Sequence, residues 1–93
     1  MTVVQVPGRK AGHIMLYALS TCGWCRKAKK LLDDLGVEYS YEYVDLLDGD
    51  EKEKAIKEVA AWNPSRRFPT LILDDEKCIV GYNEDEIRET LQR

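Results

Sequence analysis

Residues 14–36 read IMLYALSTCGWCRKAKKLLDDLG, and this stretch decides the fold. Its first six residues form a nearly continuous apolar run, which is typical of a strand buried on both faces. From Trp24 onward, apolar residues recur at helical spacing, and Gly36 is the residue type that most often ends a helix. Ser20 and Thr21 are predicted to cap the helix start. The stretch therefore predicts a buried strand that passes directly into an amphipathic helix.

The rest of the chain continues this alternation of strands and helices. Patterns of burial, acidic helix starts and turn residues predict a strand at 38–46, a helix from 48 to 63, a hairpin of strands 70–73 and 78–80, and a last helix that Asn83 caps with Glu86 three residues later. The order is β-α-β-α-β-β-α. The first β-α-β unit should be parallel and right-handed, and the hairpin should extend the same sheet with antiparallel pairing. We therefore predict an α/β fold with a four-stranded mixed sheet flanked by helices.

The chain has 93 residues, which is enough for one small domain. We assign residues 14–93 to this domain. Residues 1–13 stand apart as an N-terminal extension, which is either flexible or paired with the sheet as an added edge strand. We favour the loose extension because residues 7–12 contain proline and two glycines, which are typical of a turn or flexible segment.

The composition of the chain argues against several classes of function. The 14 Lys and Arg residues are outnumbered by 17 Asp and Glu residues, so the chain is not a nucleic-acid binder that relies on bulk positive charge. Its apolar runs are too short to cross a membrane, and its start lacks the apolar segment of a signal peptide. Three cysteines are too few, and odd in number, for a small secreted protein held together by disulfides. We expect a cytoplasmic monomer that uses cysteines for chemistry.

The pair Cys22-Gly23-Trp24-Cys25 is the predicted chemical centre. It follows a buried strand and begins a helix, where free amide groups and the helix dipole favour negative charge. Cys22 should therefore ionise more readily than a free thiol, with Arg26 and Lys27 acting in the same direction. Cys25 lies one turn later and deeper. This asymmetry predicts that Cys22 attacks a substrate disulfide and that Cys25 resolves the mixed disulfide.

The remaining cysteine leaves alternatives open. Cys78 lies in a predicted strand, where a cysteine is most often a small buried hydrophobe, although a regulatory or dimer-linking thiol is an alternative. A zinc site would need Cys22, Cys25, Cys78 and His13 to converge, and their spacing matches no common zinc pattern. We therefore assign no metal ligand.

Three motifs together resemble the glutaredoxin branch of the thioredoxin-fold family, and the resemblance covers residues 14–92. The motifs are Thr21-Cys22-Gly23-Trp24-Cys25, Phe68-Pro69-Thr70 and Gly81-Tyr82-Asn83-Glu84-Asp85-Glu86. The resemblance implies the thioredoxin fold and thiol-disulfide oxidoreductase activity. It also implies a cis Phe68–Pro69 bond that faces the cysteine pair, with the backbone at Phe68 pairing with an incoming peptide or glutathione.

The resemblance further implies a substrate-binding surface around the cysteines. The predicted substrate-binding residues are Trp24, Arg67, Phe68, Pro69, Thr70, Gly81, Tyr82, Asn83, Glu84 and Asp85. The amides that begin the last helix would receive a carboxylate, as glutaredoxins receive glutathione, and plain helix capping is the alternative. Arg66 and Arg67 would supply positive charge for glutathione or for an acidic protein partner.

Two departures from the family concern the electron donor. Many glutathione-using glutaredoxins carry a lysine where this chain has Leu19. The Gly81-Tyr82 pair looks more like the NrdH-type redoxins, which take electrons from a thioredoxin reductase. We therefore expect disulfide-containing protein substrates, no tightly bound cofactor, and one of three donors: glutathione as co-substrate, a thioredoxin-reductase-like protein or a ferredoxin-linked reductase. The alternative function is a glutaredoxin-type [2Fe–2S] cluster held between two subunits by the first cysteine and glutathione.

Overall fold

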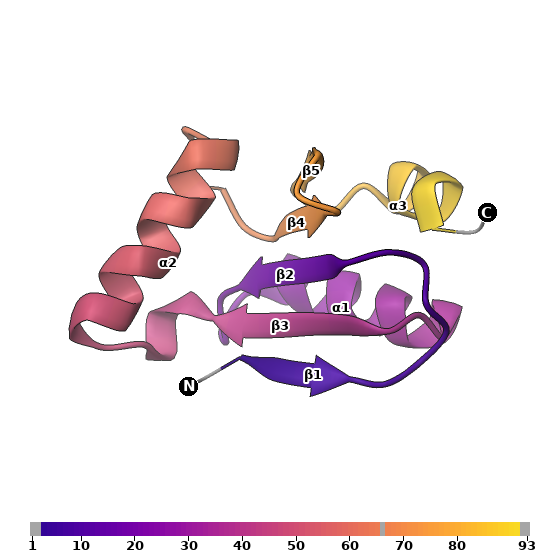
Figure 1. The fold of residues 1–93 in the computed structure, drawn as a ribbon, viewed down its shortest axis with the longest axis horizontal. Helices are drawn as coiled ribbons and strands as arrows, with labels where there is room; N and C mark the ends of the chain where they lie inside the picture. Colours follow the sequence, from indigo (N-terminus) through magenta and orange to yellow (C-terminus); the bar gives the residue numbers. More distant parts are fainter. Residues whose placement is uncertain (1–2, 66, 92–93) are drawn as a thin grey trace.

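The computed structural model describes residues 3–65 and 67–91, and a five-stranded mixed sheet forms its centre (Figure 1). The strands are β1 (Val4–Val6), β2 (Ile14–Ala18), β3 (Tyr39–Tyr43), β4 (Thr70–Leu73) and β5 (Lys77–Val80), in the spatial order β1-β3-β2-β4-β5. The helices are α1 (Gly23–Leu35), α2 (Gly49–Trp62) and α3 (Glu84–Leu91), and a short 3-10 turn, η1, covers Val44–Leu46. From residue 14 onward, the predicted order of strands and helices is confirmed.

Strand β2 is the central strand of the sheet and sets the position of the cysteines. It pairs in parallel with β3 and antiparallel with β4, and β4 pairs antiparallel with β5. The parallel β2-α1-β3 unit and the antiparallel hairpin are both as predicted. Because β2 is flanked on both sides, its carboxyl end is held firmly, and the chain leaves it directly toward Cys22.

The predicted number of four strands is wrong, because β1 adds a fifth. Strand β1 pairs antiparallel with β3, which places it at the edge of the sheet (Figure 1). A β3 edge without β1 would expose unpaired backbone groups, and β1 satisfies them. Further along, Arg9 donates to the Gly36 carbonyl and accepts from the Glu38 N–H. Gly8 is needed there because an added Cβ would lie 2.6 Å from the Gly36 carbonyl oxygen. For residues 4–6, the edge strand replaces the loose extension that we favoured.

Alternation along β2 separates two faces of the sheet. Ile14, Leu16 and Ala18 join the main core with α1 and α3, whereas Tyr17 points to the opposite face and packs in a smaller cluster with α2. Gly36 ends α1 with a φ of 68°, as its residue type predicted. The strand predicted over 38–46 ends early, because the chain turns through η1 toward α2.

Leu32 is a test of the main core. Its side chain is fully buried on α1, so Leu32→Ala should lower the free energy of unfolding by about 2–5 kcal/mol through lost burial and a residual cavity. Leu46→Ala is the matched control, because Leu46 is 63% exposed and its truncation should cost less than about 0.5 kcal/mol. Urea denaturation measures both. Equal losses in the two variants would contradict the assigned core.

Candidate active site

Cys22 is itself the residue that caps helix α1. Its sulfur accepts a hydrogen bond of 3.3 Å from the Cys25 N–H, and its side chain is partly exposed. The predicted caps, Ser20 and Thr21, are therefore wrong. Ser20 does not cap the helix, because its N–H and hydroxyl donate to the two oxygens of Asp45, at 2.8 and 2.5 Å. Asp45 thus fixes the turn that precedes the cysteines, while the helix N-terminus points a backbone amide at the Cys22 sulfur.

Cys25 lies behind Cys22 in a different environment. It is only 2% exposed and packs in the main core, and its sulfur accepts a long 3.5 Å hydrogen bond from the Leu19 N–H. Burial raises the pKa of the Cys25 thiol, and the contact with Cys22 raises it further. Cys25 is therefore protonated at neutral pH. The predicted asymmetry in burial between the two cysteines is confirmed.

The Phe68–Pro69 peptide bond is cis, as the resemblance implied. Pro69 is fully buried, and its carbonyl accepts a 2.8 Å hydrogen bond from the Gly81 N–H. This bond joins the two segments that the sequence singled out, because Gly81 begins the segment that leads into α3. Phe68 is partly buried and packs against both apolar clusters.

A buried polar network holds this loop, and no pattern in the sequence predicts it. Thr70 is fully buried, and its hydroxyl donates to the Arg67 carbonyl at 2.6 Å. Asn63, also buried, donates to the same carbonyl and to the Thr70 hydroxyl. We read Asn63 only as the end of α2, because no local pattern reveals a side chain that bridges seven residues. The Arg67 side chain is exposed, and Arg66 lies outside the described residues.

Two aromatic rings link the cysteine motif to the segment that leads into α3. Trp24 is 58% exposed, and its ring stacks on Tyr82 with centroids 5.9 Å apart. The ammonium group of Lys27 lies 4.7 Å from the Trp24 ring centroid, within the range of a cation–π interaction. The structure therefore brings Trp24 and Tyr82 together, although they lie 58 residues apart in the sequence.

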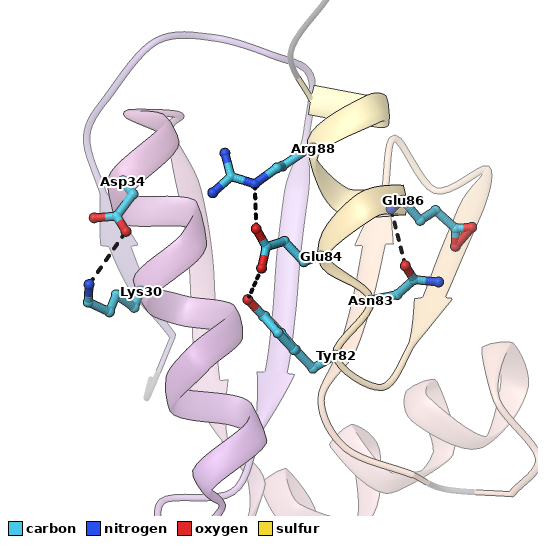
Figure 2. Close-up of polar contacts among 7 residues, drawn as sticks. All are labelled: Lys30, Asp34, Tyr82, Asn83, Glu84, Glu86 and Arg88. Carbon is cyan, nitrogen blue, oxygen red and sulfur yellow. Dashed lines mark hydrogen bonds and ion pairs between the residues drawn. The ribbon is translucent and has the colours of Figure 1, made fainter.

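Polar contacts fix the segment beyond Tyr82 (Figure 2). The Tyr82 hydroxyl donates to Glu84 at 3.2 Å, and Arg88 contacts the other oxygen of Glu84 at 2.8 Å. Asn83 accepts from the Glu86 N–H at 3.1 Å, so the predicted cap of α3 is confirmed. Asp85 is exposed in the same turn. The first turn of α3 thus carries three carboxylates, at residues 84, 85 and 86.

An apolar pocket of about 260 Å³ lies beside Leu19 and Phe68. It is lined by Leu19, Val44, Asp45, Lys52, Ile56, Val59 and Phe68. Within residues 3–65 and 67–91, no group of three or more His, Cys, Asp or Glu side chains is placed to hold a metal ion. No helix in the part of the chain that the structure describes is long and apolar enough to span a membrane.

A family model for glutaredoxin matches residues 14–79. The chain belongs to the glutaredoxin family. Glutaredoxin 1 of Rickettsia felis is 36% identical over 62 residues, which cover 67% of this chain and 58% of that protein. The gene 56 protein of Mycobacterium phage D29 is 30% identical over 78 residues, which cover 84% of this chain and 81% of that protein. Members of the glutaredoxin family are generally thiol-disulfide oxidoreductases, and the Cys22–Cys25 pair is the redox pair of this glutaredoxin.

Solved structures of similar proteins have the same fold as this chain. The glutaredoxin of Methanosarcina mazei Go1 is 53% identical with a TM-score of 0.92, and the match covers all of this chain and 90% of that one. The methanoredoxin of Methanosarcina acetivorans is 57% identical with a TM-score of 0.89, and the match covers 92% of this chain and 90% of that one. This glutaredoxin therefore has the thioredoxin-like fold that the motifs implied.

Differential alkylation tests the asymmetry between the cysteines. In the reduced native glutaredoxin at pH 7, iodoacetamide should modify Cys22 at least about tenfold faster than Cys25, because alkylation needs an accessible thiolate. Cys78 should also react slowly, because burial raises its pKa. Peptide mapping by mass spectrometry measures the three rates, and unfolded protein serves as the control.

The pH dependence of the same reaction has a definite sign. A thiol whose pKa is raised gains thiolate only at alkaline pH, so modification of Cys25 should accelerate as the pH rises above neutrality. A Cys25 that reacts as fast as Cys22 at pH 7 would contradict the assigned asymmetry.

Proposed function

We propose that this glutaredoxin reduces disulfide bonds of protein substrates with both cysteines of the pair. One observation carries the proposal. The Cys22 sulfur is partly exposed at a helix N-terminus, and the neighbouring Cys25 is buried and protonated. Exposure and a donated backbone hydrogen bond suit a nucleophile, whereas burial suits a thiol that acts only after a mixed disulfide has formed.

The proposed reaction has two exchange steps. The Cys22 thiolate attacks one sulfur of the substrate disulfide; a Cys22–substrate bond forms, the substrate S–S bond breaks, and the departing thiolate takes a proton from water. Cys25 then gives up its proton and attacks the Cys22 sulfur. The second substrate sulfur leaves as a thiol, and a Cys22–Cys25 disulfide remains. Two electrons have passed from the cysteine pair to the substrate.

The substrate would lie between two walls of the site. We assign one wall to the loop of Arg67, Phe68, Pro69 and Thr70, and the other to Gly81, Tyr82, Asn83, Glu84 and Asp85. The hydrogen bond between Gly81 and Pro69 supports this assignment because it holds the walls together. Trp24 is the proposed contact for protein substrates, since a large exposed ring beside the nucleophile is typical of a protein-binding residue.

Glutathione is a possible co-substrate, and two features weigh against dependence on it. A carboxylate bound at the start of α3 would face the three carboxylates of its first turn. Leu19, at the position of the family's lysine, lines an apolar pocket. The oxidised pair can equally take its two electrons from a thioredoxin-reductase-like protein or a ferredoxin-linked reductase. Dithiothreitol is therefore the reductant in the tests below, so that their outcome does not depend on the donor.

Single cysteine variants test the two roles. Cys22→Ser should reduce insulin no faster than dithiothreitol alone, because the attacking sulfur is gone. Cys25→Ser that is reduced beforehand and then freed of dithiothreitol should form a mixed disulfide with insulin that persists, because no neighbouring thiol resolves it; non-reducing gel electrophoresis and mass spectrometry detect it. Cys78→Ser is the matched control and should keep full activity. Wild-type activity in Cys22→Ser would refute the proposed mechanism.

Trp24→Ala tests the proposed protein contact. The variant should lower kcat/KM for insulin by about fivefold to tenfold, the loss expected when truncation of a contact residue costs about 1 kcal/mol. Reduction of a small disulfide, bis(2-hydroxyethyl) disulfide, should change less than about twofold in the same variant. Trp62→Ala is the control, because Trp62 lies on α2 and its indole binds Glu58. An equal loss on both substrates would contradict a role in protein recognition.

A further inference from the structure

A second concavity lies away from the cysteines, between the sheet and α2. Its volume is about 470 Å³, and its lining residues are Val3, Tyr17, Glu42, Glu51, Lys54, Ala55 and Glu58. It shares no lining residue with the pocket beside Leu19 and none with the assigned redox site. Its volume lies within the range of small-ligand sites in proteins.

Glu42 is the unusual residue of this cavity. It lies on β3 and is only 9% exposed, yet no hydrogen bond or ion pair joins its carboxylate to another described residue. Every fully enclosed side-chain oxygen or nitrogen among the described residues has a hydrogen-bond partner. The Glu42 oxygens have none among those residues, so they are not fully enclosed and remain in contact with the open cavity that Glu42 lines. A carboxylate in this position costs free energy unless a positive group or a donor meets it.

Two further carboxylates beside Glu42 increase the negative charge of the cavity lining. Glu51 and Glu58 line the cavity from α2, and neither forms an ion pair with another described residue. Among the described lining residues, Lys54 is the one basic residue. Burial and the charge of Glu51 raise the pKa of Glu42, whereas the positive charge of the amino terminus acts in the opposite direction. Tyr17, directly beside Glu42 in the parallel register, has its pKa raised to about 12 by burial and then by the charges of Glu58 and Glu42. The cavity therefore favours a cation.

We propose that this cavity binds an organic ammonium ion on a short alkyl stem. The carboxylate of Glu42 accepts hydrogen bonds from the ammonium group, and the face of the Tyr17 ring attracts the same charge. Val3 and Ala55 provide apolar surface for the stem. A bare metal ion fits poorly, because the described residues include no group of three ligands placed for one.

The ammonium site does not depend on the proposed redox function, because the two sites have no residue in common. The ammonium group can belong to a free amine or to a lysine side chain of a partner protein. Both sources present the same chemistry to Glu42, and they differ in the peptide groups that accompany the stem. The experiment therefore uses one probe of each kind.

The test is an NMR titration of the intact protein at pH 7. We expect n-butylammonium to shift the amide signals of Tyr17, Glu42 and Glu51 in a saturable manner, whereas n-butanol at the same concentration shifts them little. Glu42→Gln should weaken binding at least about tenfold, the loss of one charged hydrogen-bonded contact. Glu53→Gln is the control, because Glu53 lies on α2 with Glu51 and Glu58, pairs with Lys57 and does not line the cavity.

A second titration with Nα-acetyl-lysine methylamide distinguishes the sources. Tighter binding than n-butylammonium would favour a lysine side chain of a partner, and weaker binding would favour a free amine; saturable binding of either supports the site. Glu51→Gln keeps the test decisive if Glu42→Gln folds poorly, and it should weaken binding as well. Equal binding by wild type and both variants, or shifts scattered over the surface, would overturn the proposal. Insulin reduction by the Glu42 variant checks independently that the redox site is intact.

Discussion

The hydrogen bond from the Cys25 N–H to the Cys22 sulfur couples the fold of this glutaredoxin to its chemistry. It exists because β2, a strand paired on both sides, ends at Ala18 and α1 begins shortly afterwards at Gly23. The first amides of any helix lack partners within the helix, and here one of them finds its acceptor in the reactive sulfur. The same contact that caps the start of the helix therefore also positions the proposed nucleophile. Moving the helix start by one residue would separate these two roles.

The burial of Cys25, in contrast to the partial exposure of Cys22, follows from the same geometry. One turn into α1, a side chain on the inner face of the helix enters the core, and Cys25 is accordingly 2% exposed. Burial keeps it protonated, because the low polarity around it disfavours a thiolate. The spacing of two residues between the cysteines is thus enough to give them different exposure and different ionisation. The Gly81 N–H and the Pro69 carbonyl join the two segments that are proposed to position a substrate beside Cys22.

Local patterns in the sequence were sufficient for the elements and for the cysteine pair, because burial and helix periodicity act over a few residues. They failed where a contact spans the chain. Strand β1 depends on a free edge of β3, which no property of residues 4–6 reveals. Ser20 carries a good capping side chain, yet Asp45, 25 residues away, takes both of its hydrogen bonds. Asn63 similarly holds a carbonyl and a hydroxyl in a loop that begins after its helix has ended.

The two faces of the sheet meet different demands, and this difference accounts for the position of Glu42. The face under α1 and α3 is filled by apolar side chains, and Cys25 is buried among them. The face under α2 has a smaller apolar cluster near the cysteines, and beyond it the helix carries charged residues against β3. Burial and the charge of Glu51 raise the pKa of Glu42, so folding disfavours the ionised form of its carboxyl group. A glutamine of the same size would avoid that cost. The charge is therefore better explained by a ligand of opposite sign than by the packing of the sheet.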